Sequence, residues 1–446
     1  NLDNIILKDI YISAPKNSYV SSIGLNKAPI TNNITLENIE IYGNRYVSGF
    51  SARGVNNPNT NINISNVNIS ANNDYVGSYQ ATKEYLGILS NYNNFKANNI
   101  TVTGNNYVGG LFGVGGANNV YIEEIDVRGM AYVGGIAGNS MVWRVMNNVV
   151  KNATVNGATN VGGAYADGYS INNMEVIDSL INGINSVGGV VGKKRYEGSM
   201  LSVINSEING DSSVGGLVGE FDSGSFLKDT FVFNSKINGV NKVGGLIGEF
   251  KNGEVFSSYV QSNVNSTESD VGSIIGYVNN TGETEGQNKN FLYQIYASTT
   301  VTGNDNIGVI GRMDKKPLDG RYYGIIDASH YSSDNPNAKI NATIASNPEF
   351  VSNINNFLVY DGVTINGEKV DTSDKKYTGV NFVSDVDLRN SSTYTNAGYN
   401  NSYWDFTPLN EGYFPKLKNV ENQEGVLLPV STNNMLMSNY MLRSNS

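Results

Sequence analysis

The chain has 446 residues, of which 16% are charged and 39% hydrophobic, and a net charge of −10. This composition excludes a disordered tract, and the lack of a basic cluster in the sequence argues against nucleic acid as a partner. The sequence contains no cysteine, which excludes disulfides, thiol nucleophiles and cysteine-ligated zinc. No apolar run reaches the roughly 18 residues of a membrane-spanning helix, so we expect no membrane span.

A repeat centred on Val-Gly-Gly occupies residues 1–312. The apolar residue that opens the motif recurs at intervals of 25 to 36 residues, and most intervals are 25 to 29. These marker residues are Val20, Val47, Val76, Val108, Val133, Val161, Val187, Val214, Val243, Val271 and Ile307. Self-similarity at such a period is typical of solenoids, in which each repeat forms one coil.

The residue types within each repeat favour strands over helices. Asn, Gly, Thr and Val are poor helix formers, and the leucine framework of leucine-rich repeats is missing. Short β-branched runs broken by Asn-Gly and Gly-Gly indicate strands and tight turns. We therefore predict an all-β, right-handed parallel β-helix of about 11 coils, with the marker residues stacked one strand spacing, about 4.8 Å, apart. The register stays open, because Leu217 and Val218 cannot both point inward on one regular strand.

Beyond Arg312 the sequence changes character. Residues 313–418 are predicted to form a small, mixed C-terminal cap, with a short amphipathic helix over 347–358 and strand character again over 377–390. Residues 419–446 are read as a linker to a missing downstream domain. Because the chain starts at Asn1 without Met, we expect it to be a piece of a longer polypeptide.

A column of tyrosines precedes the first markers. It consists of Tyr19, Tyr46, Tyr75, Tyr107 and Tyr132. Stacked aromatic rings stabilise a sheet, and they can also serve as a platform for a ligand. Both interpretations stay open, as does the question of whether the column lies inside or outside the coil.

Two carboxylates form the second candidate site. Glu220 and Glu249 occupy the same repeat position and would stack one strand spacing apart, close enough for the paired acids of a polysaccharide-active enzyme. The alternative is a solvated ladder, in which Lys193 on the neighbouring coil compensates their charge.

The sequence offers little other chemistry. His330 is its single histidine, and it lies in a polar loop without an HExxH or G-x-S-x-G motif. Glu123, Glu124 and Asp126 form an acidic cluster that could bind Ca²⁺, although the regular spacing of calcium-binding repeats is missing. We therefore expect no catalytic residue, no metal ligand and no cofactor in this segment.

The repeat resembles the GLUG motif, named for its Gly-Leu-any-Gly core. The matching segments are VGGLFG at 108–113, VGGIAG at 133–138, VGGVVG at 187–192, VGGLVGE at 214–220 and VGGLIGE at 243–249. YWDF at 403–406 and GYFPKLK at 412–418 resemble the usual end of such arrays, and NQEGVLLPVS at 422–431 resembles a junction to a following domain.

Such arrays are similar to the N-terminal region of the IgA1-specific zinc metalloprotease family of Gram-positive bacteria. The resemblance implies a non-catalytic region of a secreted or cell wall-attached protein, whose zinc and catalytic domain lie downstream. It also implies a protein partner, IgA1, which the region would position, or a role as a spacer. The alternatives are a surface adhesin or stalk, and a polysaccharide-active β-helix that uses Glu220 and Glu249.

Overall fold

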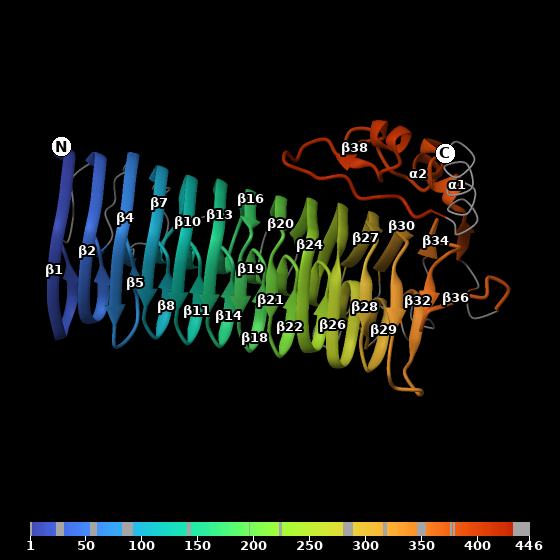
Figure 1. Cartoon of the computed structure of the whole chain (residues 1–446), viewed down its shortest axis with the longest axis horizontal. Helices are drawn as coiled ribbons and strands as arrows, with labels where there is room; N and C mark the ends of the chain where they lie inside the picture. Colours follow the sequence, from blue (N-terminus) through green and yellow to red (C-terminus); the bar gives the residue numbers. More distant parts are fainter. Residues whose placement is uncertain are drawn as a thin grey trace, which may run out of the picture.

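The computed structural model describes residues 2–23, 31–53, 60–82, 92–140, 144–195, 197–222, 225–279, 289–314, 319–345, 354–374, 377 and 380–430. It confirms the predicted all-β parallel solenoid, with 67% strand, 4% helix and about ten turns, close to the 11 that we predicted. Figure 1 shows the coils stacked along one long axis, with a small C-terminal element lying beside them.

Each coil contributes strands to three ladders that run along this axis. The longest strands are β1 (Leu2–Ser21), β2 (Thr31–Ser48), β4 (Thr60–Ala71), β7 (Tyr92–Thr103), β10 (Ala117–Arg128), β13 (Val145–Asn156), β16 (Ile171–Ile177), β20 (Gly198–Ile204), β24 (Ser225–Gly244), β26 (Gly253–Val278), β27 (Lys289–Ala297) and β30 (Asp319–Asp327). Six of the marker valines lie on the short strands β5 (Val76–Gly77), β8 (Asn106–Gly109), β11 (Ala131–Gly134), β14 (Thr159–Gly162), β18 (Asn185–Gly188) and β22 (Ser212–Gly215). The other four marker valines lie within the long strands β1, β2, β24 and β26. The chain then returns through β3 (Ser51–Arg53), β6 (Gln80–Thr82), β9 (Phe112–Val114), β12 (Ala137–Asn139), β15 (Tyr165–Gly168), β19 (Val191–Lys194), β23 (Val218–Phe221) and β25 (Ile247–Phe250).

The marker residues form the predicted internal ladder. Val187 pairs with Val214, Val214 pairs with Val243, and the same register extends from Val20 to Ile307. Val187, Val214 and Val243 are fully buried. Each coil therefore covers the apolar side chains of its neighbours, which a single coil cannot do alone.

Glycines allow the chain to turn sharply after most of the markers. A Cβ on Gly215 would overlap the carbonyl oxygen of Val218, and a Cβ on Gly216 would overlap the carbonyl oxygen of Gly245 on the next coil. The turn between β22 and β23 also answers the question of register. Leu217 lies in the turn and Val218 begins the returning strand, so both side chains are buried without a regular alternation.

Kinks interrupt the long strands at residues with positive φ. The first kink column is Asn4, Asn33, Asn61, Asn94, Asn119, Asn147, Asn173, Met200, Asp229, Ser257, Gln294 and Gly324. The second kink column is Asp9, Asn38, Asn66, Asn99, Glu124, Asn152, Asp178, Asn205 and Asn234. Asparagine tolerates the left-handed region better than most residues, and its amide can also hydrogen-bond to the next coil. Asn61, for example, donates to Asn33 at 3.0 Å.

The parallel ladders continue beyond the end of the sequence repeat at Arg312. β30 pairs with β27, and β31 (His330–Ser332) pairs with β28 (Thr300–Thr302). β32 (Ile340–Ala345) pairs with β29 (Asp305–Met313). The coil therefore extends into the segment that we predicted to be a cap, because pairing needs a matching backbone edge and not the glycine motif.

The helix expected over 347–358 is wrong where it can be tested. Residues 346–353 lie outside the described part, and the rest of the range contains the strands β33 (Ile354–Asn355) and β34 (Leu358–Tyr360). Leu358 pairs with Ile326, so the edge of the preceding coil decides the conformation of an ambiguous apolar run. The short elements that follow are β35 (Thr364–Ile365), β36 (Glu368–Lys369), β37 (Asn381–Val383), α1 (Asp385–Leu388) and α2 (Ser391–Asn396).

Residues 397–428, here called the strap, fold back along the solenoid. The strap contains β38 (Trp404–Asp405), the 3₁₀ helix Thr407–Glu411 and β39 (Lys416–Leu417). Figure 1 shows it in red beside the coils from β20 onward, and the hydrogen bond from Asn422 to Glu175 reaches the coil of β16. Residues 419–430, which we expected to be part of a linker, are therefore packed against the rod, and residues 431–446 lie outside the described part.

Candidate functional site

The five predicted tyrosines form one continuous stack at an outer corner of the coil. Neighbouring ring centroids are 4.5, 4.8, 4.9 and 4.7 Å apart from Tyr19 to Tyr132, and the rings lie within 8° of parallel. All five have a positive φ, between 53° and 64°. The ladder lies on the outside, where Tyr19 is 44% exposed.

The stacking limits what the tyrosine ladder can bind. Tyr46, Tyr75 and Tyr107 have both ring faces covered by neighbouring rings, so these rings offer no flat face to a sugar. The Arg45 guanidinium lies beside this stack, 4.8 and 5.3 Å from the ring centroids of Tyr46 and Tyr75. Burial raises the pKa of the Tyr46 and Tyr107 hydroxyls. This geometry favours a structural stack over a ligand platform.

Beyond Tyr132 the same corner column becomes polar. Its later members are Asn160, Ser186, Ser213, Lys242, Asp270 and Asn306, and all of them keep a positive φ. Some of these side chains reach the adjacent column that contains the two glutamates. Ser186 Oγ donates to Glu220 at 3.3 Å, and Ser213 Oγ donates to Glu249 at 3.0 Å. Polar residues of this corner column therefore hydrogen-bond to the glutamates of the adjacent column.

Glu220 and Glu249 are register partners on β23 and β25, as their sequence spacing indicates. Glu220 accepts from Lys193 Nζ at 3.1 Å and from Lys251 Nζ at 2.5 Å. Glu249 accepts from Lys242 Nζ at 2.8 Å. We call this group of stacked carboxylates and lysines the charged strip. The predicted compensation by Lys193 is present, with two further lysines beside it.

Hydrogen bonding keeps the second glutamate ionised. Burial alone would raise the pKa of Glu249, but hydrogen bonds from Asn279 at 2.8 Å and from Lys242 outweigh it and lower this pKa. For Lys251, burial is likewise outweighed by Glu220, and the pKa of the ammonium is raised. An acid catalyst in glycoside hydrolysis needs a raised pKa to hold its proton. Glu249 has the opposite property, and lysines pair with both glutamates, so the charged strip has the character of a structural ion-pair ladder.

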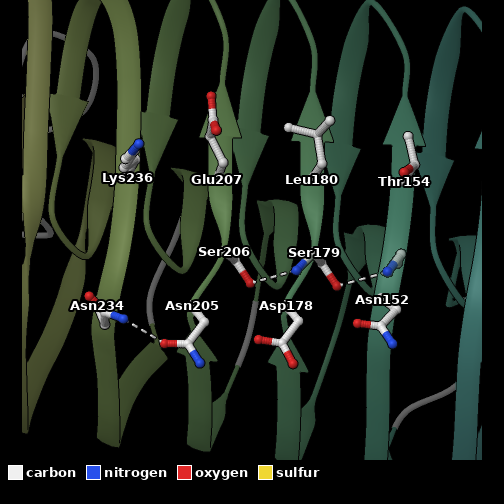
Figure 2. A pocket seen from close by; sticks show the side chains of 11 residues that line it. Asn152, Thr154, Asp178, Ser179, Leu180, Asn205, Ser206, Glu207, Asn234 and Lys236 are labelled. Carbon is white, nitrogen blue, oxygen red and sulfur yellow. Dashed lines mark hydrogen bonds between the residues drawn. The ribbon is translucent and has the colours of Figure 1, made fainter.

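A groove that the sequence reasoning missed follows the second kink column. Figure 2 shows its side chains in rows along the rod, with Asn152, Asp178, Asn205 and Asn234 in one row. The facing row is Thr154, Leu180, Glu207 and Lys236. Between the two rows lie Ser179 and Ser206. The signal in the sequence is an Asn or Asp followed by Ser, repeated at 178–179, 205–206 and 234–235.

The serines in this second-kink groove hold the coils together. Ser179 Oγ accepts from the backbone N–H of Ala153 at 3.1 Å and donates to the carbonyl oxygen of Ile177 at 2.7 Å. Ser206 Oγ accepts from the N–H of Ser179 in the same way. These hydroxyls replace backbone pairing where the strand is broken between β16 and β17 (Leu180–Asn182). They have no histidine beside them, so the groove presents hydrogen-bonding groups and no activated nucleophile.

A second groove follows the first kink column, and the strap fills its C-terminal half. Ala397 packs its carbonyl oxygen directly on Gly324, and Tyr296 stacks on Phe414 with ring centroids 4.6 Å apart. Tyr296 also donates to the carbonyl oxygen of Pro415 at 3.2 Å. The outward-facing residues under the strap are Glu175, Ser202, Phe231, Tyr259 and Tyr296. All are at most 8% exposed, although regular alternation would place them in solvent.

The remaining sequence candidates do not form a site. Glu123 accepts from Tyr121 at 2.9 Å and lies 3.5 Å from Lys151 Nζ, and Asp126 pairs with Arg128. His330 Nδ1 lies 2.9 Å from Thr364 Oγ1. Within the described ranges, no three His, Asp or Glu side chains gather as metal ligands, and no helix has the length and apolarity to cross a membrane.

The fold and these surfaces define a parallel β-solenoid with ladders of paired side chains. No family model matches the chain, and no curated protein matches it. Among solved structures, it is similar to the crystal structure of "a putative immunoglobulin A1 protease from Bacteroides ovatus", with 15% identity and a TM-score of 0.39. The match covers 69% of this chain and 88% of the other. It is a distant structural resemblance.

Proposed function

We propose that this chain is the non-catalytic solenoid region of a secreted or cell wall-attached IgA1-type zinc metalloprotease. In this role it holds the immunoglobulin for a catalytic domain elsewhere, or sets the distance between that domain and the cell surface. The zinc belongs to the catalytic domain. The proposal rests on the GLUG-type motif and on the rod that this motif builds.

The observation that carries the non-catalytic part is the neutralisation of the charged strip. Glu220 is paired with Lys193 and Lys251, and Glu249 is paired with Lys242. Carboxylates with such partners stabilise the stacking of coils, whereas a glycosidase needs one acid that keeps its proton. This argues against the polysaccharide-active alternative.

The shape of the molecule supports a role as a spacer or positioning scaffold. Successive coils are joined by matched ladders from Val20 to Ile307, so the marker column keeps one register along the rod. Outer corners are reinforced by the tyrosine ladder in the first coils and by ion pairs in later ones. A surface adhesin or stalk would use the same rod, and only a binding experiment separates the two roles.

The test is binding of IgA1 to the purified chain, measured by surface plasmon resonance with IgG as the control antibody. Specific binding of IgA1 without cleavage is the expected result for a positioning role. Failure to bind at high micromolar concentration would remove positioning and leave the spacer role. Hydrolysis of a polysaccharide that Glu249→Gln abolishes would overturn the proposal.

A further inference from the structure

The groove along the first kink column continues beyond the strap into the N-terminal half of the rod. Under the strap, its outward-facing column ends at Glu175, and the register partner of Glu175 on the next coil is Val149. From there the open groove runs over β13, β10, β7 and β4. Its lining includes Asn61, Asn63, Asn94, Lys96, Asn119, Tyr121, Asn147 and Val149. We call this part the open groove.

The strap shows how such a groove holds a polypeptide. Asn422 Nδ2 donates to Glu175 at 3.1 Å, and Asn419 Nδ2 donates to Asp229 at 3.4 Å. Glu175 and Asp229 belong to coils two steps apart. Asn419 and Asn422 lie at the turn where the strap reverses direction, since the Leu417 N–H donates to Gln423 and Tyr413 pairs antiparallel with Leu427. On either side of this turn the strap runs along the rod (Figure 1).

Apolar side chains supply the rest of the strap interface. Val420, Val426 and Leu428 of the strap are buried, and on the rod Phe231 and Tyr259 become fully covered. The interface therefore combines buried apolar residues with amide side chains that meet carboxylates. The outward-facing column is continuous in register from Tyr296 to Lys96, and within the described residues the strap reaches as far as Glu175.

The open groove continues the same strand positions as the covered part, but the side chains at these positions differ. Tyr121 is 42% exposed at the position that Tyr259 and Tyr296 occupy under the strap, and Val149 is partly exposed. One coil before Tyr121, this column holds Lys96, which is exposed. A carboxylate on the occupant would complement Lys96, and an apolar side chain would cover Tyr121 and Val149.

We propose that the open groove is a docking site for an extended polypeptide segment of a partner, with an acidic residue about three positions from an apolar one. The segment would lie along the rod as the strap does, with its carboxylate at Lys96 and its apolar side chain at Tyr121 and Val149. Continuity with the strap interface favours a polypeptide over a polysaccharide. This inference does not depend on the identity of the parent protein.

The test uses the whole chain and a fluorescein-labelled peptide of 12 residues, Gly and Ser except for an Asp and a Leu three positions apart. Fluorescence anisotropy measures its affinity, with a peptide in which Lys replaces Asp for comparison. We expect the Asp peptide to bind at least about tenfold more tightly than the Lys peptide. Hydrogen exchange should show protection at 94–96, 119–121 and 147–149 on binding.

Two matched variants locate the site. Val149→Arg places a charge in the open groove, and Leu180→Arg places one at a partly exposed position of the second-kink groove. We expect Val149→Arg to weaken binding at least about tenfold and Leu180→Arg to leave it unchanged, with both variants folded by circular dichroism. Equal affinity for both variants, no binding of the Asp peptide, or binding of a neutral glucan oligosaccharide in its place would overturn the proposal.

Discussion

Asn422 donates a hydrogen bond to Glu175 at 3.1 Å across 247 positions of the chain. This contact joins the end of the described chain to the middle of the rod. Because Asn422 lies at the tip of the strap, it marks the point where the groove of the first kink column changes from covered to open. The strap is therefore part of the folded solenoid, and its tip separates the covered part of this groove from the open part.

Phe414→Ala should loosen the strap and destabilise the protein. The ring of Phe414 is fully buried and stacks on Tyr296, so its removal leaves a cavity over the groove. We expect a loss of about 3–5 kcal/mol in the free energy of unfolding, measured by guanidinium denaturation. Leu427→Ala is the control, because Leu427 is 68% exposed, and a similar loss in that variant would contradict the role of the Phe414 contact.

Gly215→Ala should destabilise the coil at the marker turn. The added methyl group would overlap the carbonyl oxygen of Val218, so the backbone of the turn must move. We expect a cost of about 1–3 kcal/mol or more in the free energy of unfolding. Ser212→Ala on the same strand serves as the control and should change stability by about 0.5 kcal/mol or less. If Gly215→Ala left the free energy of unfolding unchanged, the turn would have space for a Cβ, which would contradict the structure.

Tyr75→Val should cost more stability than Tyr75→Asn. Both changes remove the stacking on Tyr46 and Tyr107, but Tyr75 has a φ of 64°, which a β-branched residue adopts with strain and asparagine tolerates. We expect the two variants to differ by about 1–2 kcal/mol in the free energy of unfolding. Equal stabilities would mean that ring stacking, and not backbone conformation, decides which residue fits this corner.

Asp327 should make stability depend on pH in mildly acidic solution. Its carboxyl is fully buried and accepts from Tyr331 at 2.8 Å, and burial raises its pKa to about 6. A carboxyl whose folded pKa is raised binds its proton more tightly in the folded state. Its contribution to stability is therefore complete below pH 4 and is lost as pH rises through about 6.

The expected loss is about 3 kcal/mol between these limits. Denaturation curves recorded from pH 4 to pH 8 measure it. Asp327→Asn keeps a neutral group at the site and should remove most of this dependence, while an exposed control, Asp334→Asn, should keep it. If the stability of Asp327→Asn changed with pH as much as that of the unchanged protein, Asp327 would not be the source of the pH dependence.

Glu249→Gln should destabilise the protein at neutral pH and have less effect in acid. Hydrogen bonds from Asn279 and Lys242 outweigh burial and lower the pKa of Glu249 in the folded state. Its contribution is therefore present above the ordinary range of a glutamate and is lost as pH falls through the folded pKa. We expect a cost of about 1–3 kcal/mol at pH 7 by thermal or chemical unfolding. A cost that grows towards low pH would have the wrong sign.

The sequence predicted the parts of the fold that depend on repetition. The marker valines, the tyrosine stack and the pairing of Glu220 with Glu249 all follow from equal spacing along the chain. The strap could not be read in this way, because its contacts join residues that share no period. The outward column of Phe231, Tyr259 and Tyr296 was a usable signal, since three large apolar residues at solvent-facing positions require a cover.

The helix expected over 347–358 failed for a related reason. Its apolar spacing suited an amphipathic helix, but the free edge of β30 offered hydrogen bonds that a single-sequence pattern cannot reveal. The two kink columns and the serines of the second-kink groove were also missed. They depend on which residues adopt a positive φ, and Asn is common in both turns and kinks of this chain.

The strap also has a mechanical consequence. Hydrogen bonds between coils run along the rod, so a pull on its two ends loads each interface in series, and coils detach one after another. The strap bridges the coils from β30 to β16 through Gly324 and Glu175, and it carries part of the load there. Under tension the coils from β1 to β13 would unravel first, while the bridged part would stay folded as an anchor.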